Sequence, residues 1–221
     1  MLRSPAVPYV APFAVFMALL ALGSVWPLTG GADQLARILI LIAVIWAVSR
    51  PVLDFKVRNW FGTLGIGVLI FVLWIVPDLL YPGYRHLWLF DNSVVGTIHS
   101  SLSAAEKNDM AVLALRTFRA SVLVPILEEL FWRGWLMRWL LGPDFRTVPL
   151  GAYSATSFWV VAILFASEHG PYWDVGLVAG ILFNYWMVRT KSLGDLILAH
   201  AVANLCLSVY VIAAGKWEYW L

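Results

Sequence analysis

The chain has 221 residues, of which 62% are hydrophobic and 13% are charged. A soluble domain carries roughly 45–50% apolar and about 25% charged residues, so the composition excludes an ordinary soluble protein. The net charge of +2 indicates no acidic partner, and we expect no binding to nucleic acid. The thirteen Trp and eight Tyr residues fit aromatic belts at the membrane interfaces. We therefore expect an all-α, polytopic transmembrane helical bundle that forms a single integral membrane domain, residues 1–221.

Seven apolar stretches separated by Pro, Gly or charged residues predict about seven membrane spans, at residues 6–26, 35–48, 59–76, 110–141, 152–167, 175–188 and 193–214. A helix needs about 20 apolar residues to cross a bilayer, so the second and fifth stretches are short. Proline ends or kinks a helix. We therefore expect Pro77 to stop the third span and Pro125 to kink or restart the fourth.

The longest polar region, residues 81–109, is expected to be a surface loop with short interfacial helices. Residues 94–102 fit one such helix, because four apolar side chains would share one face. His86 and His99 fall in this loop, where we expect no catalytic role. The single cysteine, Cys206, excludes an intrachain disulfide.

Two adjacent carboxylates interrupt the fourth apolar stretch. Glu128 and Glu129 begin the sequence EELFWR, which ends at Arg133. Glu129 and Arg133 are four residues apart, so they share a helical face and can neutralise one another. Glu128 lies about 100° round the helix from Glu129 and needs a different partner, which makes it the candidate general base. Pro125 lacks an N–H and leaves a backbone carbonyl free one turn earlier, a common feature beside intramembrane sites.

Two further polar clusters lie on other predicted spans. In FASEH, Phe165 and His169 are one turn apart, and the Gly-Pro that follows places His169 at a rim that water can reach. In HAVAN, His200 and Asn204 are four residues apart, and both can donate hydrogen bonds to a developing oxyanion. An interfacial histidine and an interhelical hydrogen bond are the structural alternatives. Ionisable groups inside membranes mark functional sites, so the three clusters together predict one shared polar site.

The three motifs, in this order and on separate spans, resemble those of a known family. EELFWR looks like its EExxxR motif, FASEH like its FxxxH motif and HAVAN like its HxxxN motif. The family is the CPBP group of intramembrane proteases, which includes the type II CAAX prenyl endopeptidases and the bacteriocin self-immunity proteins. The motif region spans residues 120–210, within an expected protease core of three or four helices at about residues 110–214. The chain also resembles the bacterial CAAX-protease-related proteins of exosortase systems, which implies the bacterial inner membrane.

The resemblance implies an intramembrane endopeptidase that hydrolyses a peptide bond of a membrane-associated or lipidated substrate. Glu128 would activate the water, and His169 would hold and polarise it. His200 and Asn204 would stabilise the oxyanion of the tetrahedral intermediate. Three supporting residues would orient the site or pack beside it: Glu129, Arg133 and Phe165. The implied partners are a peptide or protein substrate and membrane lipids.

Three alternatives stay open. A zinc-dependent version of the same protease would use three ligands and an open fourth position: Glu128, His169 and His200. No cofactor and no metal are favoured, because the HExxH motif is absent and the ligands would come from three helices. A non-enzymatic immunity or scaffold protein could keep the polar site for structure. A proton-coupled carrier would use Glu128 as a relay.

Overall fold

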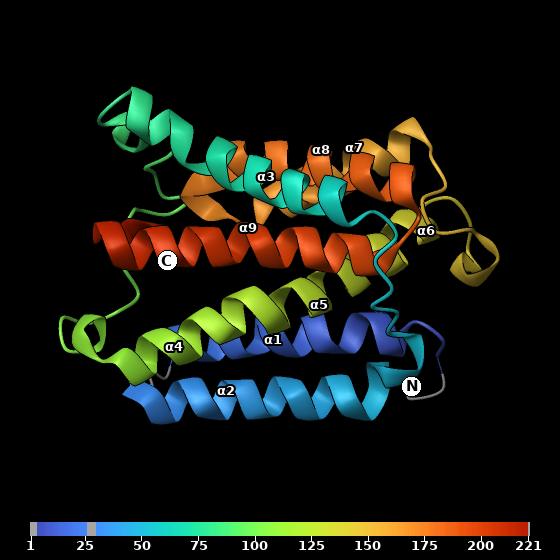
Figure 1. Cartoon of the computed structure of the whole chain (residues 1–221), viewed down its shortest axis with the longest axis horizontal. Helices are drawn as coiled ribbons and strands as arrows, with labels where there is room; N and C mark the ends of the chain where they lie inside the picture. The colour runs from blue at the N-terminus through green and yellow to red at the C-terminus, as the bar shows by residue number, and fades with distance from the viewer. Residues whose placement is uncertain (1–3, 26–29, 221) are drawn as a thin grey trace.

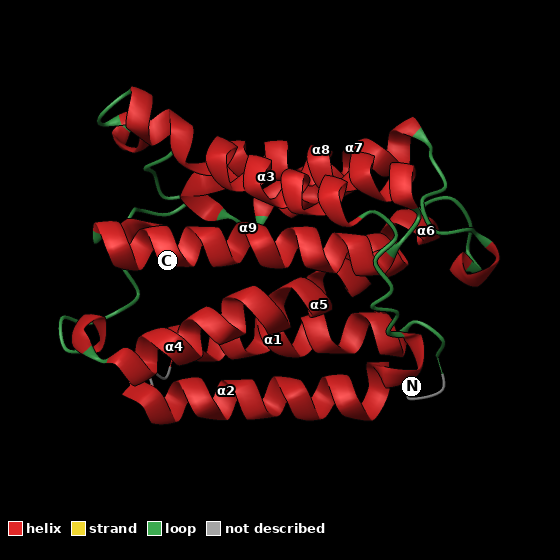
Figure 2. Ribbon diagram, in the orientation of Figure 1, coloured by secondary structure: helices red, strands yellow, loops and turns green. Residues whose placement is uncertain are grey.

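The computed structural model describes residues 4–25 and 30–220, and within these ranges the protein is all-α. Seven helices lie side by side (Figures 1 and 2): α1 (Val7–Val25), α2 (Gly30–Val44), α3 (Trp60–Leu80), the continuous helix Met110–Trp139 that contains α4 to α6, α7 (Ala155–Ser167), α8 (Trp173–Thr190) and α9 (Leu193–Ala214). The described ranges contain no strand, only an isolated bridge between Asn92 and Gly96. The all-α prediction is therefore confirmed.

Four of the described helices are long and apolar enough to cross a membrane: Gly30–Val52, Trp60–Leu80, Met110–Trp139 and Leu193–Ala214. Two shorter apolar helices, Val7–Gly23 and Ala155–Ser167, accompany them. Large apolar side chains also cover the outer surface, as in Phe61, which is 92% exposed. Soluble proteins rarely expose so much contiguous apolar area, so these helices are those of a multi-pass integral membrane protein.

Two helix boundaries differ from the prediction. α2 begins at Gly30 rather than at residue 35, because Oε1 of Glu106 accepts the Gly30 N–H at 2.7 Å. The same helix continues through a π-helical segment and a 3-10 turn to Val52. The expectation that Pro77 ends the third span was wrong. α3 runs on to Leu80, and the Tyr81 N–H closes the last turn on the Pro77 carbonyl at 3.0 Å.

The expected helix at residues 94–102 was also wrong. Gly96 has φ +92°, which a right-handed helix does not accommodate. Oδ1 of Asn92 accepts the N–H groups of Val94 and Val95, and the Asn92–Gly96 bridge closes a turn instead. Val94 is 91% exposed, so the apolar pattern there does not mark a buried face.

The helix Met110–Trp139 is continuous but irregular. Its α-helical parts α4 (Met110–Phe118), α5 (Val124–Glu129) and α6 (Met137–Trp139) alternate with two π-helical segments, Arg119–Leu123 and Leu130–Leu136. Pro125 therefore does not restart the helix; it follows a π turn. Such turns are rare and occur frequently at functional sites, and these two flank the paired glutamates.

The site helix α9 runs between α3 and the helix Met110–Trp139 (Figure 1). α3 approaches α9 closely at Gly67, where an added Cβ would lie 2.5 Å from the carbonyl oxygen of Ala199. The α9 boundaries agree with the predicted span, because Ser192 caps its first turn and Gly215 ends it in a left-handed conformation. This packing fixes His200 and Asn204 toward the carboxylates of the neighbouring helix.

Candidate active site

The first and third motifs meet at one carboxylate. Oε1 of Glu129 lies 3.0 Å from Nη1 of Arg133 and 2.9 Å from Nδ1 of His200. A carboxylate paired with an arginine accepts hydrogen bonds and donates none, so Nδ1 of His200 is the donor. The other ring nitrogen of His200, Nε2, lies on the side of Glu128. Glu129 thus selects both the orientation and the protonated nitrogen of His200.

Arg133 has no exposed surface, and several groups besides Glu129 compensate its charge. Nε donates to Oδ1 of Asn184 at 2.8 Å, and Nη2 donates to the Gly180 carbonyl at 3.3 Å. The guanidinium carbon lies 4.7 Å from the ring centre of Phe165, a cation–π contact. Arg133 therefore ties Glu129 to α7 and α8, and Phe165 packs beside the ion pair.

Asn184 is a site residue that sequence reasoning missed. It is fully buried in α8, where Nδ2 donates to the Phe158 carbonyl at 2.7 Å while Oδ1 accepts from Arg133. A signal was present, because a carboxamide inside an apolar span has to find a polar partner. Gly180 precedes Asn184 by four residues and so shares its face, and an added Cβ there would lie 3.1 Å from the Ala162 carbonyl oxygen, so the glycine allows the close approach of α7.

Glu128 has a carboxylate oxygen that no hydrogen bond holds. The residue is 6% exposed, and Oε2 is buried without a hydrogen-bond partner among the described residues. Nε2 of His200 lies 3.9 Å from this oxygen, beyond hydrogen-bond distance. A buried polar atom without a partner is rare in native structures. Glu128 therefore keeps an acceptor free for a polar atom that enters the site.

His169 lies on the turn after α7, before Gly170, which has φ +53°. Nδ1 of His169 lies 2.7 Å from the Phe165 carbonyl oxygen. Because a carbonyl only accepts, Nδ1 carries the hydrogen and Nε2 of the neutral ring is an acceptor. Burial lowers the pKa of His169 to about 4, so the ring is neutral near pH 7. The motif thus presents one imidazole acceptor to the site.

Asn204 connects α9 to the π turn before Pro125. In that turn the Val124 N–H bonds to the Arg119 carbonyl, five residues earlier. The next bond of this i to i−5 pattern would run from residue 125 to the Ala120 carbonyl. Because Pro125 has no N–H, the Ala120 carbonyl lacks that donor. Nδ2 of Asn204 supplies one, at 2.9 Å. The interhelical hydrogen bond therefore exists, and it uses one of the two N–H donors of the amide.

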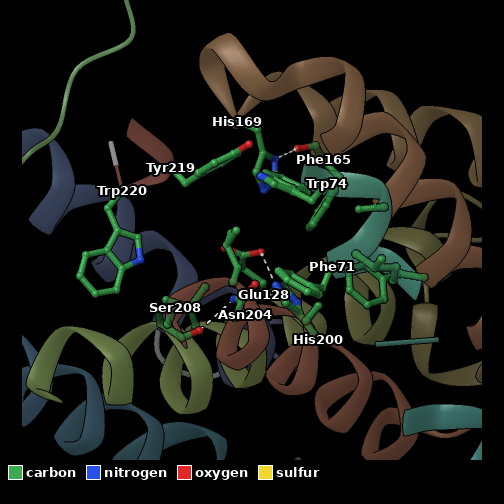
Figure 3. Close-up of a pocket in the computed structure, with 17 residues that line it drawn as sticks. Phe71, Trp74, Glu128, Phe165, His169, His200, Asn204, Ser208, Tyr219 and Trp220 are labelled. Carbon is green, nitrogen blue, oxygen red and sulfur yellow. Dashed lines mark hydrogen bonds and ion pairs between the residues drawn. The ribbon is translucent and has the colours of Figure 1, made fainter. Parts of the chain in front are cut away.

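A pocket of about 190 Å³ joins these side chains (Figure 3). Its polar wall contains the four residues that the sequence predicts as catalytic: Glu128, His169, His200 and Asn204. Its aromatic wall comes largely from outside the motifs: Phe71, Trp74, Phe165, Phe183, Tyr219 and Trp220. An apolar lining excludes water and strengthens the electrostatic interactions inside. The arrangement suits chemistry on a small polar group held in dry surroundings.

A second and more open pocket, of about 440 Å³, adjoins the first on the side of the 81–109 loop. His169 and Trp74 line both pockets. The segment after α9 crosses their junction, where the Ser101 N–H donates to the Trp220 carbonyl at 3.0 Å. His99, for which we expected no catalytic role, lines only the outer pocket. Because the outer pocket adjoins the inner one and shares its lining residues, we call it the vestibule.

Glu168 is a second residue whose place the sequence left unassigned. Its Oε1 accepts a hydrogen bond from the Trp132 indole at 3.1 Å, and it lines the vestibule. Burial raises the pKa of Glu168 to about 8, so this carboxyl is largely protonated near pH 7. Two features of the sequence could have indicated this position: Glu168 directly precedes His169, and Trp132 on the helix Met110–Trp139 offers an indole donor.

Among the described residues, no three His, Cys, Asp or Glu side chains converge closely enough to hold a metal. The zinc alternative requires Glu128, His169 and His200 as one ligand set. In the structure these residues line one pocket, and Nδ1 of each histidine is bound to an oxygen, which leaves Nε2 as the free ring nitrogen.

Comparison with known proteins agrees with the motifs. The family described as type II CAAX prenyl endopeptidase Rce1-like matches residues 110–206, a range that contains all three motifs. No curated protein and no solved structure matches the chain. Residues 110–206, under half of the chain, are therefore similar to the Rce1-like type II CAAX prenyl endopeptidases, a family of proteases.

Proposed function

We propose that this protein is an intramembrane endopeptidase that hydrolyses a peptide bond of a membrane-associated or lipidated substrate, with Glu128 activating the water. One observation carries the proposal: a buried carboxylate oxygen of Glu128 has no hydrogen-bond partner in the described part of the chain, and Glu128 lines a pocket with two histidines. A general base needs a free lone pair within reach of the proton that it removes. Glu129, by contrast, is already engaged by Arg133 and His200.

In the proposed reaction, a water molecule binds between Glu128 and His169. Nε2 of His169 accepts one hydrogen bond from it, and Glu128 removes its other proton as the oxygen attacks the peptide carbonyl carbon. The new C–O bond forms while the carbonyl π pair moves onto oxygen, which gives a tetrahedral oxyanion. Glu128 then returns its proton to the leaving nitrogen as the C–N bond breaks. Atoms and charge balance without a metal or cofactor.

The oxyanion needs donors aimed at the place where its charge develops. Asn204 has a second amide N–H besides the one bound to the Ala120 carbonyl, and it lines the pocket. His200 donates from Nδ1 to Glu129, so it would donate from Nε2 only when doubly protonated. Nε2 of His200 lies 3.9 Å from Oε2 of Glu128. We assign Glu129 and Arg133 to positioning, since they act through His200.

The test is cleavage by purified protein in detergent and in liposomes. The probes are a quenched-fluorescent peptide pool and the same peptides anchored to the bilayer by a prenyl or acyl chain. We expect Glu128→Gln to lower kcat by about 10² to 10⁴, the usual contribution of general acid–base catalysis. Asp144→Asn, an exposed carboxylate change remote from the pocket, serves as the matched control.

Unchanged cleavage by Glu128→Gln would show that the mechanism is wrong. If no probe is cleaved, and Glu128→Gln also preserves the cellular function of the protein, the non-enzymatic scaffold is the better account. Preference for prenylated over acylated peptides would identify the lipid part of the substrate.

A further inference from the structure

Exposed Lys and Arg side chains gather at one end of the bundle. Three links between helices lie at that end, the right side of Figure 1: those between α2 and α3, between α6 and α7, and between α8 and α9. Six exposed Lys and Arg residues belong to these links or to the helix ends beside them: Arg50, Lys56, Arg58, Arg146, Arg189 and Lys191. Among the described residues, Lys216 is the only Lys or Arg at the opposite end that is exposed rather than half-buried or buried. Positive charge in short loops marks the cytoplasmic side of membrane proteins.

Other cations near the opposite end are engaged within the protein. Arg85 is buried and pairs with Asp78 and Asp174. Arg37 pairs with Asp33 at 2.8 Å. Arg146 at the basic end is paired as well, with Asp144 at 2.8 Å, so exposure rather than pairing distinguishes the two ends. The asymmetry between the two ends is therefore one of exposed positive charge.

The pocket opens at the end that is poor in exposed cations. Its vestibule is lined by the 81–109 loop, by the turn after α7 and by the segment after α9, all on the left side of Figure 1. The basic end carries instead the links between α2 and α3, between α6 and α7, and between α8 and α9. Residues of those links do not line either pocket.

From these two placements we infer that the pocket faces the non-cytoplasmic side and that the substrate is a polypeptide segment presented at that membrane surface. The orientation rests on the charges alone. The substrate class rests in addition on the proposed function. A peptide confined to the cytosol would face the basic end and would have to cross the bilayer to reach the vestibule. A segment that emerges from the membrane on the other side meets it directly.

The orientation is tested in cells with single cysteines on a Cys206→Ser background. Val94→Cys reports the vestibule end, and Asp144→Cys reports the basic end; both positions are exposed. With a membrane-impermeant maleimide, we expect Val94→Cys to be labelled at least ten times faster than Asp144→Cys in intact cells. Permeabilisation should equalise the two. The reverse order, or equal labelling before permeabilisation, overturns the inference, and a permeant maleimide in detergent verifies that both thiols react.

The substrate class is tested with sealed vesicles and a membrane-impermeant quenched-fluorescent peptide pool. Right-side-out vesicles should cleave it at least ten times faster than inverted ones, and detergent should remove the difference. Faster cleavage by inverted vesicles would overturn the substrate class even if the labelling stands. Absence of cleavage in detergent would overturn the proposed function and the substrate class with it, while the labelling result would remain independent.

Discussion

Oε1 of Glu129 lies 2.9 Å from Nδ1 of His200, and this contact joins two helices through residues that are 71 positions apart in the chain. The same oxygen lies 3.0 Å from Nη1 of Arg133, so one carboxylate serves two donors. Glu128, its neighbour in sequence, keeps Oε2 free of hydrogen bonds. We therefore expect Glu129 to contribute to the stability of the fold and Glu128 to contribute to the reaction.

We predict that Glu129→Gln destabilises the protein while Glu128→Gln does not. Removing one partner of a buried ion pair leaves an uncompensated charge and costs about 3–5 kcal/mol, here on Arg133. Glu128→Gln removes no hydrogen bond made by Oε2. Thermal unfolding of the purified variants in detergent measures both. An equal fall in melting temperature for the two variants would contradict the division of roles.

Asn204→Ala should destabilise the protein by about 1–3 kcal/mol, the cost of an unsatisfied buried polar group, because the Ala120 carbonyl loses its donor. Pro125→Ala restores an N–H at the position that the π turn leaves without one. The double variant should therefore be more stable than the sum of the two single changes predicts. A double-mutant cycle by thermal unfolding tests this coupling. Strict additivity would show that Asn204 does not replace the missing donor of Pro125.

Gly67→Ala should destabilise the packing of α3 on α9. The added Cβ would lie 2.5 Å from the Ala199 carbonyl oxygen and 2.8 Å from Cβ of Val202, so the backbone of α3 or α9 has to shift. Overpacking typically costs about 1–3 kcal/mol. Gly65→Ala is the matched control on the same helix, because nothing lies within 4 Å of its added Cβ. The comparison fails if both variants unfold at the same temperature.

Stability should decline as pH rises from about 5 to 8, and Glu168→Gln should reduce that decline. Burial raises the pKa of Glu168 to about 8, above its ordinary value of about 4.3. Between these values the folded state keeps a proton that the unfolded state has lost, so raising the pH favours unfolding. Gln cannot ionise, and its amide oxygen can still accept from Trp132. Melting temperatures at several pH values measure the slope, and identical slopes would contradict the assignment.

His169 should act in the opposite direction on the acid side. Burial lowers its pKa to about 4, below its ordinary value of about 6.5. Between these values the unfolded state binds a proton that the folded state excludes, so stability is lost as the pH falls from 6.5 toward 4. His169→Gln should reduce the dependence of melting temperature on pH in that window. An undiminished slope would show that another group is responsible.

Hydropathy and short-range spacing were sufficient for much of the architecture. The α9 boundaries could be predicted because Leu193–Ala214 is a long apolar run with a cap at each end. The contact of Glu129 with Arg133 followed from helical spacing alone. The contact of Arg133 with Asn184 did not, because periodicity says which residues share a face and not which helix lies opposite.

The hydrogen-bond register of the helix Met110–Trp139 also could not be predicted from the sequence. Pro125 indicated a disturbance, yet both α- and π-helical turns are compatible with the same apolar pattern. The choice depends on a long-range contact, the amide of Asn204 on the Ala120 carbonyl. Likewise, Gly96 was included in an expected interfacial helix because its neighbours are apolar, whereas its backbone has φ +92°.

The π turn Arg119–Leu123 makes the site sensitive to chain length at a position that need not contact substrate. An α turn holds one residue fewer, and each residue turns a helix by about 100°. Val122 has a side chain that is 41% exposed. Deleting it would let the backbone hydrogen bonds of this turn form in the α-helical pattern, and α4 would rotate by about 100° relative to Glu128. Gaining or losing a single codon at such a place could therefore create or abolish the alignment of an intramembrane site without altering any of its functional groups.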